Sequence, residues 1–354
     1  MKATTLALAV SLAALATPSL AGDRVYVPMG GANEVLIIDS AQDKVIGRIG
    51  GTQEAHGLAG TADGKFLVVG SFTEEDRKGP KAPPKPKGVS KADHAAHHPK
   101  KGGKAPMMVL SGPISDVSVI AIAERSVIRK IPVQGAVHHM SMTPDGRYAI
   151  TTNPGINAIN IIDMSKFMHL KTLPTGPNPN YAVSSKDGKT VYVSNTGNNT
   201  ISEVDTANWF VRANILVGSG PEHLVLSPDG KTLYTNNAGD GTVSVISTGD
   251  GKVVKTYKIG GSAHGIDLSS DAKTLFVAGK EQNKLFAIDL GTGAMRSADL
   301  GPAPYHLASI ATGGKLYVSS ADENKIWVVD QKTLKIKSEI KVPDTAHQMV
   351  VAAY

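Results

Sequence analysis

Short apolar stretches alternate with polar turns along this chain of 354 residues, and the alternation repeats about every 42 residues. One repeat has apolar stretches at 222–227, 232–236, 242–247 and 253–259, separated by turns rich in glycine and aspartate. Stretches of this length with such boundaries are typical of β-strands, and no segment shows the period of a helix. Four short strands in each repeat predict the blade of a β-propeller.

The number of repeats predicts seven blades. Their first strands are expected to begin near residues 56, 138, 180, 222, 264, 305 and 347. The N-terminal strands at 24–28, 34–39 and 45–49 have no first strand before them, whereas 345–354 supplies a first strand alone. We expect these two parts to join in one blade, because closing the ring removes open sheet edges. The predicted fold is therefore an all-β, seven-bladed propeller of four-stranded blades that spans residues 22–354.

Residues 1–21 have the features of a secretory signal peptide. Lys2 supplies the charged start, Leu6–Leu15 is apolar, and Ser19-Leu20-Ala21 fits a cleavage site. The apolar stretch is too short to cross a bilayer, and no later one is long enough. We expect an exported protein without a membrane span, either periplasmic or secreted.

The chain contains no cysteine. Disulfides, thiolate metal sites, iron–sulfur clusters and c-type haem attachment are therefore excluded. A metal ion would have to be bound by histidine, methionine, carboxylate or carbonyl groups.

One repeat is interrupted by an insertion at 73–112, which lies between the second and third strands of its blade. Between residues 73 and 108 there are nine basic and four acidic residues, which accounts for +5 of the net charge of +6. A segment so rich in charge and proline cannot bury enough apolar surface to fold alone. Because the rest of the chain is nearly neutral, a basic surface for nucleic acid is not expected.

Histidine recurs at the start of the first strands, in two adjacent positions of the repeat that we call the first and second columns. The first column contains His56, His138, Asn180, Glu222, His264, Tyr305 and His347. The second contains Gly57, His139, Tyr181, His223, Gly265, His306 and Gln348. Seven of the 11 histidines fall in these 14 positions, where an even spread along the chain would place fewer than one. In a closed ring these side chains gather around the axis.

Two interpretations fit this pattern. Duplication of an ancestral repeat would copy a histidine that hydrogen-bonds the backbone of the neighbouring blade. Alternatively, the imidazoles bind a transition metal on the axis, since imidazole suits copper, zinc, nickel and iron. Adjacent residues of a strand point to opposite sides, so both columns cannot face the axis well unless the strand begins in a turn. The first column should therefore supply the ligands, namely His56, His138, His264 and His347. The second-column histidines, His139, His223 and His306, would then support those ligands or form a second site. Glu222 is a candidate carboxylate ligand or a partner that orients an imidazole.

The insertion adds further candidate ligands. His94, His97 and His98 form a His-x-x-His-His pattern, and Met107 and Met108 follow. Histidine and methionine on a mobile loop suit the capture and delivery of copper. The alternative is a solvated basic linker that happens to contain histidine. The turn that carries the insertion is expected on the same face as the start of the first strands.

Several repeat segments resemble the YVTN-type repeats of exported seven-bladed propellers. They are Ser227-Pro228-Asp229-Gly230-Lys231-Thr232-Leu233-Tyr234, Thr190-Val191-Tyr192-Val193-Ser194-Asn195 and Asn199-Thr200-Ile201-Ser202-Glu203-Val204-Asp205. Those repeats are similar to the propellers of cytochrome d1-type nitrite reductases. The resemblance covers the mature chain except the insertion, and it implies a fold rather than an activity.

The tandem pair His138-His139 also resembles the tandem pair in nitrous oxide reductase, which holds a copper cluster with a ring of histidines on a seven-bladed propeller. This resemblance implies copper ligation by the ring. It does not extend to that enzyme's cluster and reaction, because one blade carries Asn180 and Tyr181 instead of histidine and the chain lacks a cysteine-containing copper domain.

The sequence therefore predicts an exported propeller that binds a transition metal, copper first and zinc second, for metal handling or copper redox chemistry. A periplasmic redox or metal-delivery protein is the expected partner. The alternative is an interaction scaffold or a tetrapyrrole-binding propeller of the cytochrome d1 type. A lactone-hydrolysing propeller would need a carboxylate-rich axis, and only Glu222 is offered. No catalytic motif or phosphate-binding loop is present, so the sequence identifies no catalytic residues.

Overall fold

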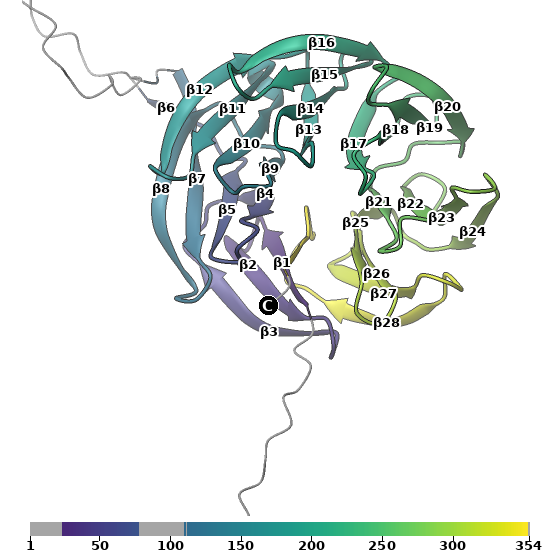
Figure 1. The fold of residues 1–354 in the computed structure, drawn as a ribbon. Coiled ribbons are helices and arrows are strands. Elements are labelled where there is room, and N and C mark those ends of the chain that lie inside the picture. The colour runs from purple at the N-terminus through teal and green to yellow at the C-terminus, as the bar shows by residue number, and fades with distance from the viewer. Residues whose placement is uncertain (1–22, 78–109, 111, 353–354) are drawn as a thin grey trace, which may run out of the picture.

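The computed structural model describes residues 23–77, 110 and 112–352, and they form seven antiparallel sheets arranged in a ring (Figure 1). The predicted seven-bladed propeller is confirmed. Within the described residues the only helical element is a single 3₁₀ turn, η1, at Pro154–Ile156. No helix among these residues is long and apolar enough to cross a membrane.

Each blade has its innermost strand at the axis and its last strand at the rim of the ring (Figure 1). Three blades, from the axis outward, are β4 (Ala55–Gly60), β5 (Phe66–Ser71), β7 (Gly112–Ala121) and β8 (Ser126–Gln134); β9 (Met140–Met142), β10 (Tyr148–Asn153), β11 (Ala158–Asp163) and β12 (Met168–Pro174); and β13 (Pro179–Ser184), β14 (Thr190–Asn195), β15 (Thr200–Asp205) and β16 (Phe210–Leu216). The next three are β17 (Pro221–Leu226), β18 (Thr232–Asn237), β19 (Thr242–Ser247) and β20 (Lys252–Lys258); β21 (Ile266–Leu268), β22 (Thr274–Gly279), β23 (Lys284–Asp289) and β24 (Met295–Asp299); and β25 (Pro304–Ile310), β26 (Lys315–Ser320), β27 (Lys325–Asp330) and β28 (Ile336–Lys341).

The seventh blade is built from both ends of the chain. It consists of β29 (Val350–Ala352), β1 (Arg24–Met29), β2 (Glu34–Asp39) and β3 (Lys44–Gly50). The C-terminal strand β29 pairs antiparallel with β1, with Val351 opposite Val25. The two parts of the chain therefore join as the repeat predicted, and the ring is closed by hydrogen bonds.

The core lies between the blades. Seven apolar clusters each join two neighbouring sheets, and the valine, isoleucine and leucine side chains in them come mainly from the middle strands. In one of them Ile201 and Ile215 pack with Leu233 and Ile246 of the next blade. Each such side chain stabilises the fold by roughly 1.5–3 kcal/mol on burial. This packing fixes the blades relative to one another and so fixes the positions of the innermost strands.

The insertion begins with an additional short strand, β6 (Glu75–Arg77), which pairs with the start of β7. This strand lies within the segment that the sequence predicted as a loop. The rest of the insertion, including His94, His97, His98, Met107 and Met108, lies outside the described residues, as do the residues of the predicted signal peptide.

Candidate metal centre

The seven column histidines come together at the axis of the ring. The ring centroid of His56 lies 4.0 Å from that of His347 and 4.8 Å from that of His138. The His223 centroid lies 4.9 Å from those of both His139 and His306. Histidines from blades that are far apart in the sequence thus form one continuous cluster.

A β-bulge at the start of the innermost strand lets both columns face the axis. In the repeat at Glu222, two residues, Glu222 and His223, stand opposite Asn236 alone, because Pro221 pairs with Asn237 and Leu224 with Thr235. The side-chain oxygen of Asn236 accepts the backbone N–H of His223 at 3.1 Å. Equivalent side-chain oxygens accept the N–H of the second-column residue in three other blades, at 3.0–3.1 Å, from Thr152, Ser194 and Ser319.

The sequence-based expectation that only the first column lines the axis well is therefore wrong. It assumed strict alternation of side chains, and a bulge removes that alternation locally. His139, His223 and His306 are all almost completely buried, with 1%, 5% and 2% of their surface exposed.

Two glycines make room for this second column. A Cβ atom on Gly57 would lie 2.8 Å from the backbone of His139, and one on Gly265 would lie 2.4 Å from the carbonyl oxygen of Tyr305. These distances are too short for any other residue without a shift of the neighbouring blade. The second column consequently holds five side chains rather than seven.

Two groups of three histidines have ligand atoms close enough to share a metal ion. The first is His56, His138 and His139, and the second is His139, His223 and His306. Within each group the ligand atoms lie within 4.8 Å of one another. Zn–N bonds are about 2.0–2.1 Å long, so nitrogens bound to one such ion lie roughly 3.3 Å apart. Small side-chain movements would bring the nitrogens of either group to that spacing.

These groups differ from the first-column set that the sequence suggested. His139, which was expected to support the ligands, belongs to both groups. His264 and His347 belong to neither among the described residues, although His264 lies next to His223 with ring centroids 4.5 Å apart.

The backbone of the neighbouring blade fixes the orientation of three imidazoles. Nδ1 of His139 lies 2.9 Å from the carbonyl oxygen of Asn180, and Nδ1 of His56 lies 2.7 Å from that of His138. Nδ1 of His138 also faces the carbonyl of Asn180, at 3.4 Å. A carbonyl only accepts hydrogen bonds, so each Nδ1 carries the proton and each Nε2 keeps a free lone pair. The predicted structural role and a ligand role therefore coexist on the same side chains.

Among the column histidines, four buried Nε2 atoms have no hydrogen-bond partner within the described part of the chain. They are those of His139, His223, His264 and His306. A buried polar atom without a partner costs about 1–3 kcal/mol, and three of these four histidines have ligand atoms within 4.8 Å of one another. A metal ion would satisfy several of these atoms at once.

All seven histidines are neutral in the folded protein at neutral pH. Burial, together with the neighbouring imidazoles, lowers the pKa of His56 to about 3 and that of His138 to about 4. Burial also lowers the pKa of His347 to about 4, and it holds the pKa values of His139, His223, His264 and His306 well below the ordinary value of 6.5. A metal ion would therefore meet no competition from protons at these nitrogens.

Glu222 lies beside His264 rather than beside the two groups. Its Oε2 is 2.6 Å from Nδ1 of His264, but the two atoms are not aligned for a hydrogen bond. Burial raises the pKa of Glu222. Both roles that the sequence allowed for Glu222, carboxylate ligand and partner of an imidazole, stay predictions.

The cluster lies between two openings of the axial channel. The first column borders a cleft of about 500 Å³ lined by His56, Phe72, Tyr305 and His347 among others. Phe72, whose ring is stacked on His56 with centroids 5.1 Å apart, immediately precedes the insertion. The insertion therefore leaves its blade at the mouth where the first strands begin, as the sequence predicted.

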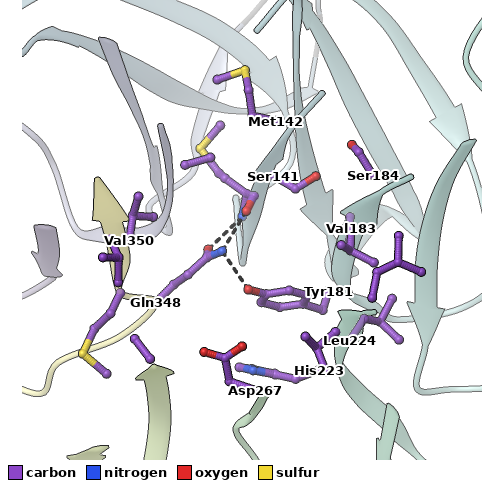
Figure 2. A pocket seen from close by; sticks show the side chains of 18 of the residues that line it. Ser141, Met142, Tyr181, Val183, Ser184, His223, Leu224, Asp267, Gln348 and Val350 are labelled. Carbon is purple, nitrogen blue, oxygen red and sulfur yellow. Dashed lines mark hydrogen bonds between the residues drawn. The ribbon is translucent and has the colours of Figure 1, made fainter. Parts of the chain in front are cut away.

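The second column borders a larger cavity of about 800 Å³ at the other end of the channel, which His223 and His306 line. Figure 2 shows Tyr181, Gln348 and Asp267 pointing into it from different blades. Gln348 accepts the N–H groups of Leu58 and Met140 and donates to the hydroxyl of Tyr181 at 3.1 Å. Asp267 is not among the site residues predicted from the sequence, although it lies only three residues after a first-column histidine.

Comparison with known proteins identifies the fold but gives no activity. No known family profile matches the chain, and no curated protein matches it. Among solved structures, the chain is similar to hydrazine synthase from Kuenenia stuttgartiensis (18% identity, TM-score 0.66, 92% of this chain and 100% of that chain). It is also similar to the periplasmic gluconolactonase PpgL of Pseudomonas aeruginosa (17%, 0.71, 94% and 99%) and to the dihydro-heme d1 dehydrogenase NirN in complex with DHE (14%, 0.60, 92% and 74%). At these identities the likeness shows a propeller fold alone.

Proposed function

We propose that this protein binds a transition-metal ion among the axial histidines and acts in metal handling or as a copper redox protein in an exported location. The observation that carries the proposal is the set of four buried Nε2 atoms without partners. Inherited repetition explains why histidines recur at these positions. It does not explain why His139, His223 and His306 bring their ligand atoms within 4.8 Å of one another.

Copper is the favoured metal and zinc is second. The donors are neutral imidazoles without thiolate, and for such nitrogen sites the divalent series places copper above zinc. The buried group of His139, His223 and His306 offers three imidazole donors within 4.8 Å of one another. Three imidazoles at this spacing suit a three-coordinate or four-coordinate ion.

His139 limits the number of ions. Its Nδ1 is engaged with the carbonyl of Asn180, so a neutral His139 has only Nε2 to offer. One nitrogen lone pair serves one ion at a time. We infer that the two histidine groups are alternative positions for a single ion, one facing each mouth of the channel.

The insertion supports a delivery route at the first mouth. Phe72, which stacks on His56, directly precedes the insertion, and the part of the insertion outside the described residues carries three histidines and two methionines. Capture by those residues would hand the ion to the group of His56, His138 and His139. A periplasmic redox or metal-delivery protein would be the partner in this process.

The test is metal binding by untagged protein. Wild-type protein loaded with copper(II) or zinc and then dialysed should retain about one equivalent by elemental analysis, and His139→Gln should lose it because both groups lose a ligand. His169→Gln is the matched control, because His169 lies on β12, away from the axis, and contacts Asn160. Wild-type protein that retains no metal, or His139→Gln protein that retains as much as wild type, would refute the proposal.

A tetrapyrrole is the second candidate, and it comes from the similarity to NirN, whose solved structure is a complex with DHE. It would sit over a mouth of the channel, where His347 or His56 would be its nearest imidazole. Reconstitution with haem should then give an absorption band that disappears in His347→Gln and persists in His139→Gln. The copper proposal predicts the opposite sensitivity.

A further inference from the structure

The larger cavity lies at the opening of the channel away from the insertion, and residues from all seven blades line it. Each of the seven blades contributes to it the residue three positions after its first-column residue. These residues are Ala59, Ser141, Val183, Val225, Asp267, Ala308 and Val350. A volume of about 800 Å³ is within the range of small-molecule sites.

Asp267 is the one charged residue at this position of the repeat, where the other six blades have small or apolar residues. Duplication cannot explain it, because the copied residue is apolar or small. Its carboxylate accepts the N–H of Leu268 and, from the next blade, the N–H of Ser309, each at 2.8 Å. Both bonds hold the side chain at the wall, and part of its surface still faces the cavity.

No cation of the described residues lies within ion-pair distance of Asp267. Lys186, the one lysine that borders the cavity, is exposed at its rim. The nearby His223 and His306 are neutral. The hydroxyl of Tyr181 is already bonded to Gln348. A carboxylate without a counter-ion attracts a cation, and the attraction is stronger at a partly buried position such as this one than in bulk water.

We propose that this cavity binds a small organic amine, whose protonated nitrogen pairs with Asp267 and whose carbon skeleton packs against apolar wall residues such as Val183, Val225 and Val350. An ammonium group supplies both the charge and the hydrogen-bond donors that the free lone pairs of the carboxylate can accept. An organic anion is disfavoured by the same carboxylate. The proposal does not depend on metal binding, since every group it uses lies in the wall beyond the histidines.

A purely structural role for Asp267 is the competing explanation, because its bond to Ser309 joins two blades. A purely structural Asp267 would not make the cavity bind amines more tightly than other ligands. The two explanations therefore differ in what the cavity binds, and not in how stable the protein is.

The experiment compares benzylamine, benzyl alcohol and benzoate, which share one shape, as ligands of the full chain at pH 7.5 with a chelator present. The chelator removes any contribution from coordination of the amine to a metal ion. Calorimetry or NMR titration should show benzylamine binding at least about tenfold more tightly than benzyl alcohol, and benzoate binding weakest.

Asp267→Asn should reduce the ratio between amine and alcohol to about one, and Asp267→Ser, which installs the residue that Ser141 provides in another blade, should do the same. Glu54→Gln is the control, because Glu54 is a carboxylate at the opposite mouth. It should leave the preference unchanged. Equal binding of amine and alcohol by wild-type protein, or a preference that survives in both Asp267 variants, overturns the proposal. A preference lost in Glu54→Gln and kept in the Asp267 variants overturns it as well.

Discussion

Mild acid should destabilise the metal-free protein strongly, because its axial histidines are neutral when folded and become protonated when unfolded. In the unfolded chain each imidazole has a pKa near 6.5, whereas burial lowers the pKa of His56 to about 3 and that of His138 to about 4. Between these values the unfolded state binds more protons than the folded state. Stability therefore rises with pH up to about 6.5 and falls as the pH drops below it.

The size of the effect follows from the unfolded state. At pH 5 the rings are protonated in the unfolded chain but still neutral in the folded protein. Each ring therefore lowers the free energy of unfolding by roughly 2 kcal/mol relative to pH 7.5. Seven such rings together cost on the order of 10 kcal/mol, which is comparable with the whole stability of a typical domain. A second proton on the folded cluster is even less favourable, because the centroids of neighbouring imidazoles lie 4.0–5.9 Å apart and the charges would repel.

Urea unfolding at a series of pH values between 7.5 and 5 measures this directly. The buried Trp209 and Trp327 provide the fluorescence signal. We expect most of the unfolding free energy to be lost by pH 5, and His139→Gln to reduce the slope by about 1.4 kcal/mol per pH unit, the contribution of one proton. An unfolding free energy that stays constant between pH 7.5 and 5 would refute the reasoning, since it would mean that the folded cluster accepts protons freely.

Three further predictions follow from individual side chains. Burial raises the pKa of Asp267 from 3.8 to about 6, so its protonation stabilises the folded state as the pH falls, and Asp267→Asn should lose about 1 kcal/mol more than wild type between pH 7.5 and 5 in the same urea series. Glu222→Gln should weaken copper binding about 10–100-fold in a competition assay if the close contact between Glu222 and His264 supports the site, and unchanged affinity would exclude that contribution. Gly265→Ala should cost about 1–3 kcal/mol in urea unfolding, because its Cβ would meet the next blade, whereas Gly249→Ala has open space and is the control.

The fold was predictable because the repeat encodes it several times. The strands expected at 222–227, 232–236, 242–247 and 253–259 match β17, β18, β19 and β20 to within one residue at each end. Each repeat carries the same turn residues and apolar stretches, so a strand that is assigned wrongly in one repeat is corrected by comparison with the others. Closure by β29 and β1 followed from the missing strands at the two ends.

The arrangement of the site was only partly predictable. The two columns were visible as positions in the repeat, but the bulge that turns both toward the axis depends on a side chain on the next strand, such as Asn236, about 13 residues away. Simple alternation cannot reveal it. Asp267 had a signal in the sequence, since alignment of the seven repeats shows one acid among small and apolar residues, but it lies outside the two histidine columns.

The blade shared by both termini determines when the centre can exist. Its last segment carries His347 and Gln348, and Gln348 joins the backbone of Leu58 and Met140 to the hydroxyl of Tyr181. The end of the chain is thus a structural member of the axis, holding together blades made from its earlier parts. Without these final residues the axis lacks His347 and the bonds by which Gln348 joins three blades. Under the proposed function, metal binding would therefore depend on closure of the ring.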